Sequence, residues 1–122
     1  MKLIALPQLF AICQLKNTNP LNWEDPYIFV AKTEDELSVV CEINSVPQDA
    51  LQVDLPWRAL KIAGTLDFGL IGIIANLSSI LAKNGISVFV ISTYNTDYLL
   101  LKDSAFEQAV RVLRREGHIV SG

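Results

Sequence analysis

The stretch from Trp57 to Lys102 constrains the fold of this 122-residue chain more than any other part. It has, in order, the pattern of a strand, a glycine-bearing loop, a helix, a strand, a polar turn and a further strand. The nearly continuous apolar run Ile86–Ile91 is typical of a central strand. The helix is indicated by apolar residues at i, i+3, i+4 and i+7 spacing, which share one face: Leu70, Ile73, Ile74, Leu77, Ile80 and Leu81. This order predicts a small soluble α/β domain and leaves its function open.

A second helix follows, because Ser104–Glu107 has the spacing of a capping box and Gly117 stops the apolar stripe that comes after it. The predicted order is therefore β-α-β-β-α, with only His118–Val120 left for a fourth strand. A ferredoxin-like βαββαβ unit is the natural topology for this order, which makes the fold class α+β. Since the last strand is short, the N-terminal segment is a candidate to help complete the sheet.

The first half of the chain has the pattern of strands without a helix. Lys2–Leu6 and Leu9–Leu15 are apolar, β-leaning runs separated by a proline. Lys16–Pro26 is rich in asparagine and proline, which favours a loop. Two further strands are predicted at Tyr27–Ala31 and Leu37–Cys41, with an acidic turn between them that we interpret as a solvated loop tip.

An internal echo links the two halves. Tyr27–Thr33 resembles Ser87–Thr93, about 60 positions later. Each run then reaches an acidic residue, Glu36 or Asp97, and a second apolar strand, with one residue of slippage between the two halves. We interpret the echo as two lobes of one topology, of which the first has lost its helix to the loop.

Composition disfavours several functional classes. The formal net charge is −3 and no basic patch is visible, so the chain has no electrostatic footprint for nucleic acid. Arg111, Arg114 and Arg115 lie near a predicted helix C-terminus, where the helix dipole favours positive charge. A single histidine excludes a histidine-rich metal site. Cys13 and Cys41 lie in apolar runs without metal-ligand spacing, and we expect them to be buried and reduced.

Hydropathy gives no sign of a membrane segment. The longest apolar helical run is interrupted by polar residues and falls short of the roughly 20 residues that span a bilayer. The N-terminal apolar run is too short, and too soon broken by Pro7, to be a signal peptide. We therefore expect a cytoplasmic protein.

Four segments together resemble the ACT-domain family: Trp57–Ile62, Gly64–Phe68, Gly72–Ile73 and Ile91–Tyr98. The branch concerned is that of small tandem ACT proteins related to CASTOR-type arginine sensors and to aspartate kinase regulatory regions. The resemblance implies ferredoxin-like units that pair side by side and bind small effectors, often amino acids, at the lobe or subunit interface. Residues 1–56 would then be a degenerate N-terminal ACT-like lobe, and residues 57–122 the C-terminal ACT lobe.

By this resemblance the ligand lies at the loop between the first strand and the first helix, with the polar turn as a second wall. The candidate ligand-binding residues are Thr65, Leu66, Asp67, Phe68, Gly69, Leu70, Ile71, Gly72, Asn95, Thr96 and Asp97.

The chemistry of the loop fits an amino acid. A helix that begins near Phe68 presents unpaired N–H groups to an α-carboxylate. Gly69 lets a ligand approach the backbone, and Asp67 or Asp97 offers a carboxylate to the α-ammonium. The residues alone also permit a structural interpretation. In that interpretation Asp67 is the N-cap of the helix, Gly69 is a turn residue, and Asn95–Asp97 is an ordinary hairpin tip.

We therefore expect a non-catalytic, amino-acid-binding sensor or regulatory protein. The alternative is a structural dimerisation module that has lost ligand binding and pairs through an exposed sheet edge. An enzyme is disfavoured, because the sequence shows no nucleophile elbow, phosphate loop or cluster of metal ligands. The expected partners are a small-molecule amino acid and a second copy in a homodimer, with no cofactor, metal, nucleic acid or membrane.

Overall fold

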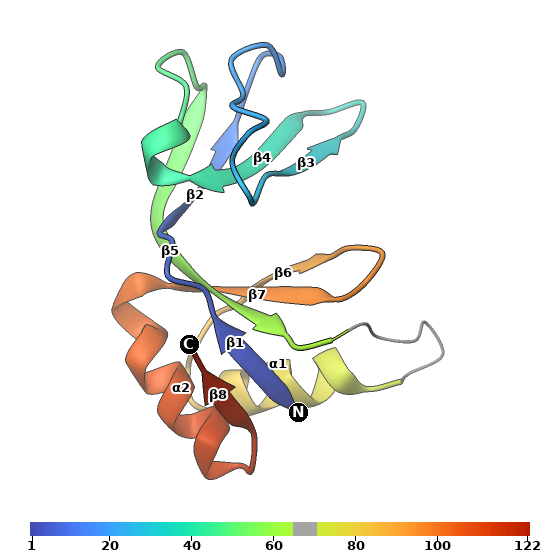
Figure 1. Ribbon diagram of the computed structural model, residues 1–122, viewed down its shortest axis with the longest axis vertical. Helices are drawn as coiled ribbons and strands as arrows, with labels where there is room; N and C mark the ends of the chain where they lie inside the picture. The colour runs from blue at the N-terminus through green and yellow to red at the C-terminus, as the bar shows by residue number, and fades with distance from the viewer. Residues whose placement is uncertain (65–70) are drawn as a thin grey trace. The chain divides into compact units, whose positions relative to one another are not determined.

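The computed structural model describes residues 1–64 and 71–122 (Figure 1). The helices are α1 (Ile73–Lys83) and α2 (Phe106–Arg115), with two short 3-10 turns, η1 (Ile43–Ser45) and η2 (Asp103–Ala105). The strands are β1 (Lys2–Ala5), β2 (Phe10–Gln14), β3 (Phe29–Lys32), β4 (Leu37–Glu42), β5 (Gln52–Ile62), β6 (Phe89–Ser92), β7 (Asp97–Lys102) and β8 (Ile119–Ser121). In the described ranges, neither helix is long and apolar enough to cross a membrane.

The chain divides into two compact units. The N-terminal unit is Gln8–Trp57, and the C-terminal unit combines Met1–Pro7 with Arg58–Gly122. Strand β5 contributes residues to both units. The segment that contains β1 thus belongs to the C-terminal unit, although the sequence placed it in the lobe of residues 1–56. The assignment of two ACT lobes to residues 1–56 and 57–122 stays a prediction.

The C-terminal unit has the predicted ferredoxin-like order of elements, β5-α1-β6-β7-α2-β8, and the α+β fold class is confirmed. Its strands lie in the order β6-β7-β5-β1-β8. Strand β1 lies between the first and last strands of the βαββαβ order. It pairs antiparallel with β5, Leu3 facing Ile62, and parallel with β8, Leu3 facing Val120. The N-terminal segment therefore completes this sheet beside the three-residue β8.

One face of this sheet carries the core of the C-terminal unit. Alternate residues of the strands contribute to it, such as Leu60 with Ile62 on β5 and Leu99 with Leu101 on β7. The helices close the core with Leu77, Leu81, Phe106, Ala109, Val112 and Leu113. The period of two in the strands and of about 3.6 in the helices turns these apolar residues to a common interior.

Helix α1 begins later than the sequence suggested. Its first helical residue is Ile73, and its N-cap is Gly72, with φ of 83°. The start predicted near Phe68 is therefore wrong for α1 as described, whereas Phe68 and the alternative N-cap Asp67 themselves lie outside the described residues. The physical reason is the left-handed backbone at Gly72, a conformation that interrupts a right-handed helix and that glycine adopts readily. The apolar stripe predicted the helix face correctly from Ile73 onward but could not reveal the backbone turn before it.

The N-terminal unit is an antiparallel sheet in the order β3-β4-β2-β5. Its core contains Ala11, Cys13, Leu15, Leu21, Val39 and Cys41. Between β2 and β3, at the place of α1 in the other unit, the chain forms a helix-free loop, as the asparagine and proline content predicted.

The two hairpins match with the same register. Phe29 faces Val40 in β3–β4, and Phe89 faces Leu100 in β6–β7, so both strands are displaced by 60 positions. The 3-10 turns that follow, η1 and η2, keep the same displacement. The predicted one-residue slippage is therefore wrong. Aligning the acidic residues caused the error, because Glu36 corresponds in place to Thr96 and not to Asp97.

Cys13 and Cys41 are buried free thiols of the N-terminal unit, as expected. They lie on neighbouring strands, β2 and β4, and each pairs across the sheet with a small apolar residue. The hydrogen bond between the two thiols lowers the pKa of Cys13 and raises the pKa of Cys41.

Replacement of Leu81 by alanine tests the core of the C-terminal unit. Leu81 is fully buried, so Leu81→Ala removes apolar contacts and leaves a cavity. We expect a loss of about 2–5 kcal/mol in the free energy of unfolding, measured by urea denaturation. The control is Ile71→Ala, because Ile71 is 94% exposed, and its cost should stay within about 0.5 kcal/mol. Equal costs for the two variants would contradict the described core.

The carboxyl of Glu42 predicts a pH dependence of stability. Burial, and then the negative charge of Asp25, raise the pKa of Glu42, and its Oε2 atom is buried without a hydrogen-bond partner. In the window just above the ordinary carboxyl pKa, the folded protein therefore binds more protons than the unfolded protein. Stability should consequently fall as the pH rises through that window.

Glu42→Gln should remove this contribution. The expected result is a shallower decline of unfolding free energy with pH, measured by urea denaturation at a series of pH values around 4.5, the ordinary pKa of the group. Glu34→Gln is the matched control, because Glu34 is exposed. An unchanged slope in Glu42→Gln would show that this carboxyl titrates alike in the folded and unfolded states.

Candidate functional site

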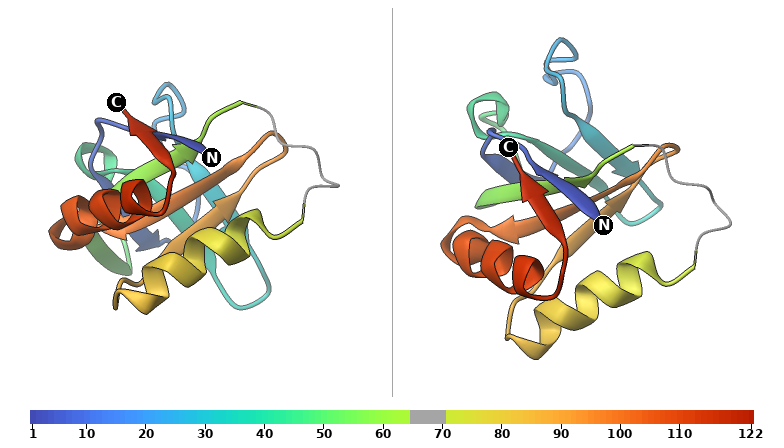
Figure 2. Two further views of the ribbon diagram at one scale, coloured as in Figure 1. Left: turned by 90° about the horizontal axis from the view of Figure 1, so that it is seen from below. Right: turned by 60° about the horizontal axis from the view of Figure 1, so that its bottom comes forward.

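Three features meet at one end of the C-terminal unit: the last residues of β5, the start of α1, and the turn between β6 and β7 (Figure 2). The meeting is fixed by pairing. Strand β7 pairs with β5, and the hydroxyl of Thr96 in the turn donates a hydrogen bond to the carbonyl oxygen of Ile62, at 2.9 Å. Helix α1 then runs back along the sheet, so its N-terminus stays at this end (Figure 2).

Among the residues that the structure describes, no side chain caps the N-terminus of α1. The first N–H groups of any α-helix lack intrahelical acceptors and carry the positive end of the helix dipole. Here the N-cap Gly72 has no side chain to accept from them, and the first turn contains no acidic residue. Such a helix end is suited to a carboxylate or another small anion.

The β6–β7 turn is held by hydrogen bonds and presents polar side chains. The amide of Thr93 donates to the carbonyl oxygen of Thr96 at 2.9 Å, and the Thr93 hydroxyl donates to the same oxygen at 3.1 Å. Thr96 is 4% exposed, and its hydroxyl is committed to Ile62, so its role in the described structure is to hold the turn against β5. Asn95 is exposed, and Asp97, the first residue of β7, is half-buried.

The structure describes only part of the predicted site. Thr65, Leu66, Asp67, Phe68, Gly69 and Leu70 lie outside the described residues. Ile71 is 94% exposed and Gly72 forms the N-cap, so both lie at the start of α1. Tyr94, which is not among the predicted site residues, is an 81% exposed aromatic side chain in the same turn as Asn95. Its signal was an aromatic residue in an otherwise polar turn.

The corresponding turn of the N-terminal unit lines a cavity of about 410 Å³, formed by residues 15–18 and 32–37. This turn repeats the same backbone bond, from the Thr33 amide to the Glu36 carbonyl oxygen at 2.9 Å. Both signs of charge line the cavity, from Lys16 and Lys32 and from Glu34, Asp35 and Glu36. From its sequence this acidic turn is interpreted only as a loop tip, because residue spacing does not show that Lys16 lies beside it.

The arrangement suits binding of a small polar molecule. A free helix N-terminus can accept an anionic group, and the carboxylate of Asp97 at the neighbouring turn can accept hydrogen bonds from an ammonium. Among the residues that the structure describes, no group of three or more histidine, cysteine, aspartate or glutamate side chains is placed to hold a metal ion.

Comparison with known proteins identifies the family. A family model described as an ACT domain matches residues 52–115, more than half of the chain, so the chain belongs to the ACT-domain family. The resemblance noted in the sequence is thereby confirmed. A second model, described as an N-terminal domain, matches residues 8–49. No curated protein sequence matches the chain.

Solved structures extend the comparison over nearly the whole chain. Protein Atu0741 from Agobacterium tumefaciens is 32% identical, with a TM-score of 0.85 over 99% of this chain and 92% of that one. Protein VC0802 from Vibrio cholerae, described as a possible transport protein, is 21% identical, with a TM-score of 0.75 over 93% and 88% of the two chains. Aspartate kinase from Clostridium acetobutylicum is 14% identical, with a TM-score of 0.64 over 90% of this chain and 33% of that enzyme. At these lower identities the likeness is one of fold.

Thr96→Val tests the bond that holds the turn. Valine has nearly the same shape as threonine but cannot donate to the carbonyl oxygen of Ile62, so we expect a loss of about 0.5–1.5 kcal/mol in unfolding free energy. Asn95→Ala, in the same turn, should be nearly neutral because Asn95 is exposed. Thermal or urea unfolding measures both. A neutral Thr96→Val would mean that the hydroxyl does not contribute to stability.

Proposed function

We propose that this protein is a non-catalytic regulatory module that binds a free amino acid. The observation that carries the proposal is the meeting of an uncapped helix N-terminus with a polar turn at one end of an ACT-family unit. The ligand would lie against the start of α1, beside the β6–β7 turn. Residues 65–70 join β5 to α1 in the sequence and complete this candidate site.

The recognition chemistry follows from the charges. The α-carboxylate of the ligand would accept hydrogen bonds from the first N–H groups of α1, to which the N-cap Gly72 offers no side-chain acceptor. Its α-ammonium would donate to Asp97 or to Asp67. The cavity at the equivalent turn of the N-terminal unit, with lysine and acidic side chains together, is consistent with a zwitterionic ligand.

One observation favours the second candidate, a structural dimerisation module. Leu51, just before β5, and Val53 and Leu55 at its start alternate along the chain and are each nearly half exposed, although they are large and apolar. Alternate residues of a strand share one side, and an exposed apolar row on a strand is suited to pairing with another chain. Whether the protein is an amino-acid-binding module or a dimerisation module, we propose that it is a cytoplasmic homodimer. The reason is that the resemblance to ACT domains implies units that pair side by side.

A thermal-shift screen of the proteinogenic amino acids tests ligand binding. A ligand that binds only the folded state stabilises it by about 2.7 kcal/mol at 100 times its Kd, so one amino acid, or a chemically related few, should raise the Tm. Isothermal titration then gives the Kd. If no amino acid raises the Tm and sedimentation at micromolar concentration shows a species heavier than the 13.5 kDa chain, the dimerisation module is the better assignment.

Two carboxylate variants locate the site. The variants are Asp67→Asn and Asp97→Asn. The one that removes the contact with the ligand ammonium loses a charge-assisted hydrogen bond, so its affinity should fall by about 1.5–3 kcal/mol, roughly ten- to a hundredfold. Asp49→Asn is the matched control, because Asp49 is exposed in the N-terminal unit. Unchanged affinity in both site variants would contradict a ligand at the start of α1.

A further inference from the structure

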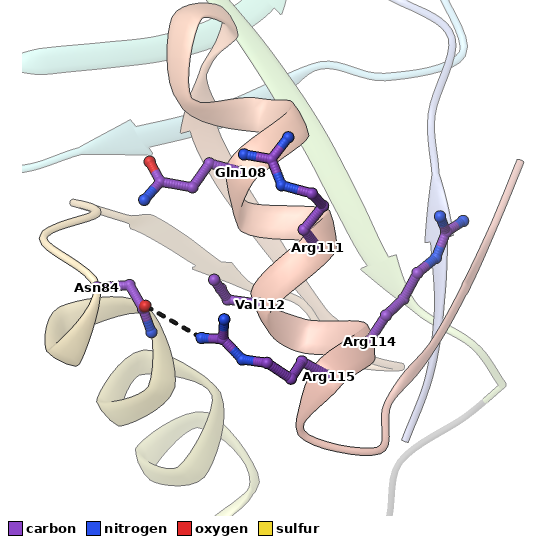
Figure 3. Close-up of a pocket in the computed structure, with 6 residues that line it drawn as sticks. All are labelled: Asn84, Gln108, Arg111, Val112, Arg114 and Arg115. Atoms are coloured by element: carbon purple, nitrogen blue, oxygen red, sulfur yellow. Dashed lines mark hydrogen bonds between the residues drawn. The ribbon is translucent and has the colours of Figure 1, made fainter.

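A cavity of the C-terminal unit lies at the C-terminal end of α1, the end opposite the candidate amino-acid site. Its volume is about 620 Å³, within the range of small-molecule sites. It is lined by Asn84, Gln108, Arg111, Val112, Arg114 and Arg115 (Figure 3). The 11-residue length of α1 separates this cavity from the candidate amino-acid site by about 16 Å at 1.5 Å per residue. The cavity is therefore a separate site.

The lining residues of α2 form one stripe. Gln108, Arg111, Val112 and Arg115 follow the i, i+3, i+4, i+7 spacing that places side chains on a single helix face. Val112 is buried and forms the apolar base of the stripe, whereas Gln108 and the two arginines are exposed. Figure 3 shows Arg115 directed toward Asn84, at the end of α1, and Arg111 one turn earlier on α2.

Two of the arginines are held in place by the fold. Nη2 of Arg115 donates to Oδ1 of Asn84 at 3.3 Å, and Nδ2 of Asn84 donates to the carbonyl oxygen of Ile80 at 2.9 Å. Nη2 of Arg114 donates to the carbonyl oxygen of Val120 at 2.7 Å. A guanidinium group has five N–H donors, so each of these arginines keeps donors for a further acceptor.

The positive charge of the cavity is not explained by the helix dipole alone. Arg114 and Arg115 belong to the last turn of α2, where a cation offsets the dipole, but Arg111 precedes that turn. Within residues 1–64 and 71–122, none of the three arginines forms an ion pair with a carboxylate. Glu107 on the helix and Glu116 after it form no ion pair with an arginine in the part of the chain that the structure describes.

We propose that this cavity binds the phosphate group of a small phosphorylated molecule. Guanidinium forks match phosphate oxygens geometrically, and charge-assisted bonds to them are stronger than neutral ones. The side-chain amides of Gln108 and Asn84 supply neutral polar contacts at the same cavity. The negative ends of the helix dipoles oppose an anion here with about half a charge each, which the two full positive charges of Arg111 and Arg115 outweigh. The chain as a whole has a net charge of −3, so this site is a local reversal of sign.

NMR titration of the ¹⁵N-labelled protein tests the proposal, with inorganic phosphate, pyrophosphate and a ribose phosphate as separate ligands at constant ionic strength. We expect saturable shifts of the amides of α2 and of Asn84, with pyrophosphate binding more tightly than phosphate because it carries more charge. Tighter binding of the ribose phosphate than of phosphate would identify the ligand as an organic phosphate. Equal or weaker binding of the ribose phosphate would contradict the proposal of an organic phosphate.

Arg111→Gln is the decisive variant, because the described structure gives Arg111 no partner whose loss would affect folding. We expect it to weaken pyrophosphate binding at least tenfold, and Arg115→Gln to do likewise. Lys2→Gln removes the same charge from an exposed position of β1, on the face of the sheet opposite the core that Leu3 joins, and should leave binding unchanged. Shifts that do not saturate, that sodium chloride reproduces, or that persist in Arg111→Gln would overturn the proposal. Amino-acid binding, measured separately in Arg111→Gln, should be unaffected.

Discussion

Strand β5 is the element on which both units depend. Its first half pairs with β2, Phe10 facing Trp57, and its last residues pair with β1, Leu3 facing Ile62. Backbone groups in a sheet interior must be paired, so each neighbour of β5 is required for the strand to be buried. In the C-terminal unit this pairing turns Leu60 and Ile62 toward both helices, and the helix core forms on them. The pairing of β1 also explains why a three-residue β8 is sufficient at the sheet edge.

The two proposed sites lie at opposite ends of α1 and use opposite features of it. At the first end, Gly72 leaves the positive helix terminus without a side-chain cap. At the second end, Asn84 orients Arg115 and anchors itself to the carbonyl oxygen of Ile80. A helix packed firmly through Leu77 and Leu81 holds both ends in place. Binding at one end could therefore alter the other only by moving this helix or its neighbours.

Several features of the fold were readable from local patterns. The apolar spacing from Ile73 to Leu81, the asparagine-rich loop and the hairpin echo each led to the correct element. The wrong predictions, the start of α1 and the hairpin register, concern features that residue spacing does not encode. The start of α1 depends on a left-handed backbone at Gly72, and the hairpin register depends on which residues face each other across the ladder. The arginines of α2 were interpreted through the dipole alone, because the sequence does not show that Asn84 lies beside them.

The sequence by itself determined the order of elements, the ACT family and the polar character of the β6–β7 turn, because these follow from residue periodicity and local motifs within short windows. Only the tertiary structure decided the rest. It assigned β1 to the C-terminal sheet, committed the Thr96 hydroxyl to Ile62, and placed Arg111 and Arg115 on a common cavity with Asn84. Each of these is a contact between residues distant along the chain. Such contacts depend on how strands pair and helices pack, which local spacing does not specify.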